Sequence, residues 1–156
     1  MWIFVGVAII AFVGLIYFKQ SGLVAQMNTV TLAEIPRVYE ALRSTGEDGS
    51  WAGLIPPKLR PDDEEHLNVQ FSIENGAIGF DWLLVSSINI RDRSKFTALL
   101  NSKRIPYREV EQNGVSYLRI EGGRAASICQ SVLEDMYGVT GRMGIEMIVE
   151  GFEWVP

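Results

Sequence analysis

Hydrophobic and polar positions divide the chain into an apolar N-terminal run and a longer part in which the two kinds alternate. The run from Trp2 to Phe18 contains no charged residue. As a helix it would be roughly 26 Å long, close to the thickness of the hydrocarbon core of a bilayer. Trp2 at one end, with Tyr17, Phe18 and Lys19 at the other, suits the two membrane interfaces. The pattern predicts a single-pass transmembrane helix over residues 1–18.

A cleavable signal peptide is the alternative reading of the same run. Such a peptide carries basic residues before a shorter apolar stretch and small residues at its cleavage site. No basic side chain precedes Trp2, and Leu23-Val24-Ala25 is the nearest approach to a cleavage site. We therefore expect an uncleaved anchor that binds membrane lipid. The nearest basic residues, Lys19 and Arg37, both follow the run, which predicts a cytoplasmic domain by the positive-inside rule.

Residues 19–66 are predicted to connect the anchor to a folded domain. Apolar residues recur at helical spacing over 31–44, and Thr31 and Glu34 are placed as a capping box, which predicts an amphipathic helix. Pro36 fits the first turn of that helix. The stretch after the helix is rich in proline, glycine and acidic residues, so we expect a linker there.

Residues 67–156 are predicted to form one α+β domain. Strict alternation over 67–73 predicts a half-buried strand, and Asn75-Gly76 after it is a strong signal for a tight hairpin. A two-residue turn would pair Ile73 with Ile78 and keep the apolar face continuous along both strands. The sequence therefore predicts the register of this hairpin as well as its position.

After that turn the expected order is strand, helix, strand, strand, helix, strand. The first of these strands covers 77–90, and the helix after it runs from an N-cap at Asp92 to Lys103. Asn113-Gly114 predicts a second hairpin. This order matches the βαββαβ layout of ferredoxin-like folds. The strand at 67–73 is an extra N-terminal strand whose place in that sheet the pattern leaves open.

Composition narrows the classes of function. The formal net charge of −5 argues against nucleic-acid binding, which needs a basic footprint. The single cysteine, Cys129, excludes an intramolecular disulfide, and neither it nor His66 has partner residues that catalysis or metal binding requires. An enzyme built on carboxylates such as Asp81 and Glu121 has no other support in the sequence. We expect no catalysis, no cofactor and no metal.

Charge is distributed unevenly along the predicted domain. Basic residues gather between 91 and 108, whereas acidic residues gather toward the C-terminus. The candidate interaction residues in this basic stretch are Arg91, Arg93, Lys95, Arg104 and Arg108. On a tethered domain they would face anionic lipid. The alternative is an ordinary solvated helix face.

The last predicted strand gives a second candidate interaction surface, for a protein partner. Ile148, Phe152 and Trp154 share one side of that strand. They form an exposed apolar patch unless a helix covers them. The helix predicted over 31–44 is the obvious cover.

A candidate anion site lies where a strand gives way to a helix, at Gly122, Gly123 and Arg124. Backbone N–H groups at such a junction can hold an anion, although two glycines also make a tight turn without any ligand. The turn Asn89–Asp92 is a second possible anion position. Two hypotheses follow: a membrane-tethered interaction or scaffold module without catalysis, and a small-ligand sensor that binds an anion on a ferredoxin-like fold.

Overall fold

Seven strands form one antiparallel sheet in the part of the chain that the structure, a computed structural model, describes: residues 26–58 and 60–156. The strands are β1 (Gln26–Val30), β2 (Trp51–Ile55), β3 (Val69–Glu74), β4 (Ala77–Leu83), β5 (Arg108–Gln112), β6 (Val115–Glu121) and β7 (Ile145–Glu150). The helices are α2 (Ile35–Thr45), α3 (Ser87–Ser102) and α4 (Ala125–Ser131), with a 3-10 turn at Leu32–Glu34 and a π-helical segment at Val132–Met136. The predicted α+β class is confirmed.

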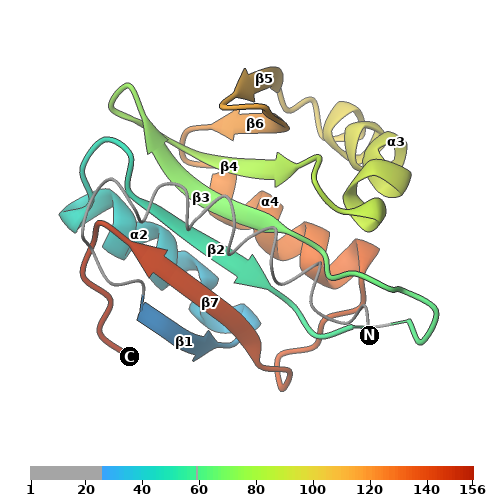
Figure 1. Cartoon of the computed structure of the whole chain (residues 1–156), viewed down its shortest axis with the longest axis horizontal. Helices are drawn as coiled ribbons and strands as arrows, with labels where there is room; N and C mark the ends of the chain where they lie inside the picture. The colour runs from blue at the N-terminus through green and yellow to red at the C-terminus, as the bar shows by residue number, and fades with distance from the viewer. Residues whose placement is uncertain (1–25, 59) are drawn as a thin grey trace.

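The helices cover one face of the sheet. Figure 1 shows α2 and α4 behind the strands, with α3 beside the far end of β4. On this face Phe71 meets Tyr39 of α2, and Trp82 stacks on Phe96 of α3 with ring centroids 4.4 Å apart. Burial of these large apolar side chains is the main stabilising contribution to such a fold. No helix of residues 26–58 and 60–156 covers the opposite face, which we call the helix-free face and which carries the polar residues of the central strands.

Both predicted hairpins are confirmed. In the first, Ile73 pairs with Ile78, as the sequence predicts. Its turn residues Asn75 and Gly76 have φ of 51° and 75°, and Asn113 and Gly114 have φ of 53° and 78° in the second. A type I′ turn needs positive φ at both central residues, which asparagine and glycine tolerate best.

The helix predicted over 31–44 is also confirmed. The Thr31 backbone N–H donates to the Glu34 carboxylate at 2.8 Å, and Pro36 lies in the first turn of α2. The hydrogen bond from Thr31 holds the pKa of Glu34 below its usual value. The capping box therefore fixes where this part of the chain becomes helical.

Two strands lie within residues 19–66, where the sequence predicts only a helix between a polar connector and a linker. β2 pairs with β3 on one side and with β7 on the other, and its Ala52 and Leu54 are fully buried. The sequence does not predict this strand, because it contains Gly53 and is followed by prolines, and such residues are unfavourable inside strands. β1 is short and mostly polar, so its alternation is too weak to detect.

The strand predicted over 77–90 ends at Leu83, and α3 begins earlier than predicted, capped by Ser86 rather than Asp92. The Ser86 hydroxyl oxygen accepts from the Asn89 N–H at 3.2 Å. The Asn89 side chain in turn exchanges two hydrogen bonds with the backbone of Asn68, at 2.7 and 3.0 Å. This long-range pairing fixes the start of α3, which local alternation does not reveal.

The strand order differs from that of a four-stranded ferredoxin-like sheet. The sheet runs β1-β7-β2-β3-β4-β6-β5. The crossover from β4 through α3 to β5 passes around β6, as predicted, but β7 does not lie beside β4. The β2–β3 pair occupies that edge instead. The ferredoxin-like part of the prediction is therefore not confirmed.

The predicted membrane anchor, with Trp2, Tyr17, Phe18 and Lys19, lies outside the described residues. Among residues 26–58 and 60–156, no helix combines the length and apolar character needed to cross a bilayer. The anchor therefore stays a prediction.

Candidate functional site

Most of the predicted basic surface is paired with acidic side chains of the same domain. The ion pairs are Arg91 with Asp63 and Asp92, Arg93 with Glu109, Lys95 with Asp92, and Arg108 with Glu121. Pairs that are exposed on both sides, such as Arg93 with Glu109, add little stability, but all of these pairs neutralise the surface locally. Arg104 and its neighbour Lys103 are exceptions, since within the described part of the chain neither side chain has a hydrogen bond or ion pair. Only a small part of the predicted surface keeps unbalanced positive charge.

Asp92 is a buried link between α3 and the segment after α4. Its side chain is 3% exposed, and it accepts hydrogen bonds from Arg91, Lys95 and the Tyr137 hydroxyl. The hydrogen bond from Arg91 lowers the pKa of Asp92 to about 2. Burial raises the pKa of Tyr137. Asp92 thus acts as a structural anion within α3 rather than as the helix cap that the sequence predicts.

The N-terminal end of α3 is occupied by a carboxylate of the chain itself. The Ser87 backbone N–H donates to Glu65, and Arg91 one turn later binds Asp63 at 3.0 Å. The acidic loop before β3 thereby contacts the Asn89–Asp92 turn, the second predicted anion position. This contact weakens the case for an external anion at that turn.

The predicted apolar set of the last strand is divided between two environments. Ile148 lies half-buried on the helix-free face of β7. Phe152 packs against the core, and Trp154 is 5% exposed with the Arg37 guanidinium 5.4 Å from its ring centroid. β7 ends before Gly151, whose φ of 79° turns the chain, so strand alternation does not extend to Trp154. The helix α2 covers Trp154, as the sequence predicts, but not Ile148.

Gly122, Gly123 and Arg124 stand at the junction of β6 and α4, all exposed. Gly122 has φ of 91°, a conformation that favours glycine. Its carbonyl accepts the Tyr39 hydroxyl at 3.2 Å and the Ala125 N–H at 3.1 Å. The turn therefore requires Gly122 on structural grounds alone, and anion binding there stays a prediction.

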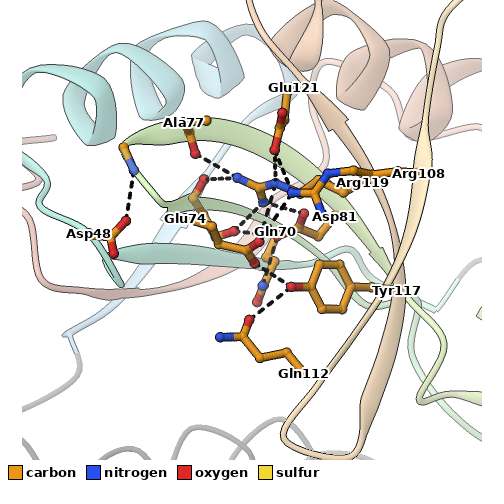
Figure 2. Close-up of polar contacts among 12 residues, drawn as sticks. Asp48, Gln70, Glu74, Ala77, Asp81, Arg108, Gln112, Tyr117, Arg119 and Glu121 are labelled. Atoms are coloured by element: carbon orange, nitrogen blue, oxygen red, sulfur yellow. Dashed lines mark hydrogen bonds and ion pairs between the residues drawn. The ribbon is translucent and has the colours of Figure 1, made fainter.

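An arginine buried in the helix-free face carries the densest polar network of the described residues (Figure 2). Arg119 on β6 donates from Nη1 to Asp81 at 2.7 Å and to the Ser72 hydroxyl at 2.8 Å. Its Nη2 donates to the carbonyls of Ala77 and Ser72, and its Nε donates to Glu121 at 2.9 Å. A guanidinium has five N–H donors, so this arginine has no donor left for a ligand.

Asp81 is equally enclosed. It lies opposite Arg119 in the register of β4 and β6, and both side chains have an exposed fraction of 0%. The Ser72 hydroxyl donates to it at 2.5 Å and the Gln70 amide at 3.1 Å. Burial raises the pKa of Asp81, while the adjacent Arg119 opposes that shift. The pair therefore joins three central strands and exposes no group to solvent.

Gly79 makes the space that the guanidinium fills. A Cβ atom at this position would lie 2.7 Å from Cζ of Arg119. Glycine is otherwise unfavourable in the middle of a strand, because it has no side chain to pack and loses more entropy on folding. The buried arginine and this glycine are thus two parts of one arrangement.

An outer ring of groups, from the buried Tyr117 to the half-exposed Arg108 and Glu121, surrounds the buried pair. The Tyr117 hydroxyl donates to Glu74 at 2.6 Å, and burial raises the pKa of this tyrosine. Hydrogen bonds from Arg108 and from Arg119 lower the pKa of Glu121. Each carboxylate of this outer ring has a cation or a hydroxyl beside it, so the ring extends the internal network outward.

Sequence reasoning alone does not single out this network. Asp81 and Glu121 appear there only as unsupported catalytic carboxylates. The usable signal is the Asn75-Gly76 turn, because its register places Gln70 opposite Asp81 among polar positions of neighbouring strands. The pairing of β4 with β6, which adds Arg119, depends on contacts distant in sequence.

Comparisons with protein-family models, with curated proteins and with solved structures find no match for this chain. Within residues 26–58 and 60–156, no three His, Cys, Asp or Glu side chains are placed to share a metal ion. Cys129 is fully buried in the core, and burial raises the pKa of its thiol, which makes it unreactive. The function is therefore inferred from the chain's own residues.

Proposed function

We propose that this chain is a membrane-tethered interaction module that carries out no catalysis. The observation that carries the proposal is the uncharged run Trp2–Phe18 directly ahead of a folded α+β domain. A run of this length and composition is typical of a membrane span. The basic residues Lys19 and Arg37 follow it, so the proposal places the domain on the cytoplasmic side.

The absence of catalysis in this proposal is supported by the Arg119 network. Its two buried charged groups, Arg119 and Asp81, already have hydrogen-bond partners within the fold. A catalytic group has to reach a substrate atom within hydrogen-bond distance. Arg119 and Asp81 have no exposed surface from which to do so.

Carbonate extraction of membranes tests the tether. The wild-type chain is expected to stay in the membrane pellet, and the double variant Ile9→Arg, Ile10→Arg to be released, because each arginine at the centre of a span costs about 3 kcal/mol. The matched control is Met27→Arg, Ile90→Arg, which adds the same charges at side chains that are 71% and 59% exposed. Release of the wild-type chain, or a mature N-terminus after Ala25, would show that the tether is wrong.

The anion sensor on a ferredoxin-like fold is the competing proposal. It retains the β4-α3-β5-β6 unit as a scaffold and Gly122 to Arg124 as the site. The internal hydrogen bonds of Gly122 and the contact of Glu65 with Ser87 count against it. Thermal shifts of the full chain with phosphate and with small carboxylates separate the two proposals, since only a sensor gains stability from them.

A further inference from the structure

We propose that the corner between α3 and β5 docks an acidic segment of a protein partner. This inference rests on the proposed function as a tethered interaction module. The corner consists of Lys103, Arg104 and Tyr107, with the exposed Pro106 between them. It is called the α3–β5 corner below.

Charge is the first argument. Lys103 and Arg104 are adjacent and exposed, and their side chains have no partner within the described residues, whereas the other basic candidates are paired. Because the whole chain has a net charge of −5, an acidic ligand is repelled by the molecule in general. Attraction is therefore confined to a local basic site such as this one.

The aromatic ring beside these cations is the second argument. Tyr107 is 38% exposed, one of the few large apolar side chains of the described residues that reach the surface. Arg108 follows it, 50% exposed, with only one of its nitrogens within 3 Å of Glu121. Tyrosine and arginine are the residues most enriched at the energetic centres of interfaces.

The backbone of Arg104 is the third argument. This residue has φ of 53°, just beyond the C-terminus of α3. The Ile105 N–H donates to the Leu100 carbonyl at 2.9 Å, the long hydrogen bond of a Schellman motif. Glycine is the favoured residue at this left-handed position, so arginine occupies it against local backbone preference. A binding role explains an arginine at a position where glycine would serve the fold better.

The position of the corner favours a protein partner over lipid, because the corner lies at the sheet edge opposite the strand that follows the proposed tether. β1, which follows the tether, and β5, which follows the corner, are opposite edges of the sheet (Figure 1). Six strand spacings separate them by about 29 Å. The connector from Lys19 to Gln26 spans at most about 25 Å when fully extended. The corner is therefore presented away from the point where the chain leaves the membrane.

A peptide titration tests this proposal. The full chain is placed in nanodiscs of neutral phosphatidylcholine and titrated with a fluorescent decaglutamate peptide, with decaserine as the uncharged reference. We expect decaglutamate to bind more tightly than decaserine and to weaken from low to physiological salt. In the variant Lys103→Glu, Arg104→Glu the affinity should fall roughly tenfold or more.

The matched control is Arg60→Glu, Arg142→Glu, because these two exposed arginines also have no side-chain hydrogen bond or ion pair in the described part, lie in no candidate site and change the net charge by the same amount. It should keep the wild-type affinity within about twofold, and equal melting temperatures of both variants establish that both are folded.

Equal loss of affinity in the two variants, or no preference for decaglutamate over decaserine, overturns the proposal. Binding in trans to phosphatidylglycerol vesicles that depends on Lys103 and Arg104, without peptide binding, overturns it in favour of lipid. If carbonate releases the chain, the titration is run without nanodiscs. The carbonate extraction then tests the tether, and the titration tests peptide binding at the α3–β5 corner independently.

Discussion

Arg119 and Asp81 face each other across two central strands, and both side chains are removed from water. Removing one partner leaves the other charge buried and unpaired, which costs about 3–5 kcal/mol. We predict a loss of that size in the free energy of unfolding for Arg119→Met, measured by urea denaturation followed by tryptophan fluorescence. The double variant Arg119→Met, Asp81→Leu should recover part of it, because no charge remains buried. A single variant as stable as wild type would contradict the structural role of the pair.

Gly79 offers a second test of the same network. A methyl group at this position would collide with the Arg119 guanidinium, 2.7 Å from its Cζ atom. Gly79→Ala should therefore destabilise the fold by about 1–3 kcal/mol through overpacking. Gly123→Ala is the matched control, since nothing lies within 4 Å of a Cβ there. Similar melting temperatures for the two variants would show that Gly79 does not serve to admit the arginine.

The depressed pKa of Asp92 makes the free energy of unfolding fall as the pH becomes acidic. Its pKa is about 2 in the folded chain, against about 4 in an unfolded one. A carboxyl with a depressed folded-state pKa contributes its stabilisation above the unfolded value and loses it as pH falls toward the folded value. We expect the wild-type chain to lose up to about 2 kcal/mol from this group between roughly pH 5 and pH 2. The Asp92→Asn variant should show a flatter curve in acid denaturation, and parallel curves would refute the assignment.

Among the elements, the C-terminus of α3 links the stability of the fold to the proposed peptide binding, because Arg104 takes part in both. Arg104 occupies the left-handed position after the helix, where glycine avoids a conformational cost of about 1 kcal/mol. Arg104→Gly should therefore raise the free energy of unfolding by about that amount while weakening decaglutamate binding. Lys103→Gly is the control for the backbone effect: its φ of −89° gives glycine no advantage, so stability should not rise. A less stable Arg104→Gly chain would remove the backbone argument for a binding role.

Elements with strong local signals are the ones that the sequence predicts. The two Asn-Gly turns and the Thr31–Glu34 capping box each require particular residues at neighbouring positions, so their outcome is decided locally. β2 has no such local signal. Gly53 lowers its strand propensity, and its stability comes from pairing with β3 and β7 on either side. The start of α3 is also not predictable locally, because it depends on a hydrogen bond between Asn89 and the distant Asn68.

The candidate site shows the same division between local and long-range information. A stretch of basic residues is visible in the sequence, but its neutralisation by Asp63 and Glu109 follows from tertiary contacts. Lys103 and Arg104 remain unpaired because no acidic side chain of the described residues folds against them. To predict the burial of Arg119 one has to know that β6 lies beside β4. The expected βαββαβ order gives that neighbour but not the position of Arg119 opposite Asp81.

For the whole molecule, the sheet has two unlike edges. β5 at one edge carries the exposed charges of Arg108, Glu109 and Glu111, which protect an edge strand from pairing with another chain. β1 at the other edge carries no charge within Gln26–Val30. The proposed tether enters at that uncharged edge, and the proposed partner site lies at the charged one.

In the described sheet the outermost strand β1 has a single neighbour, β7, which is the last strand of that sheet along the chain. During synthesis β1 therefore lacks its partner strand until residues 145–150 have been translated. Pairing between such distant segments is slow, because a large loop has to close first. A chain inserted early through its apolar run would hold an unfinished sheet at the membrane surface, and a premature stop before Ile145 would leave both β1 and β2 without the strand that joins them.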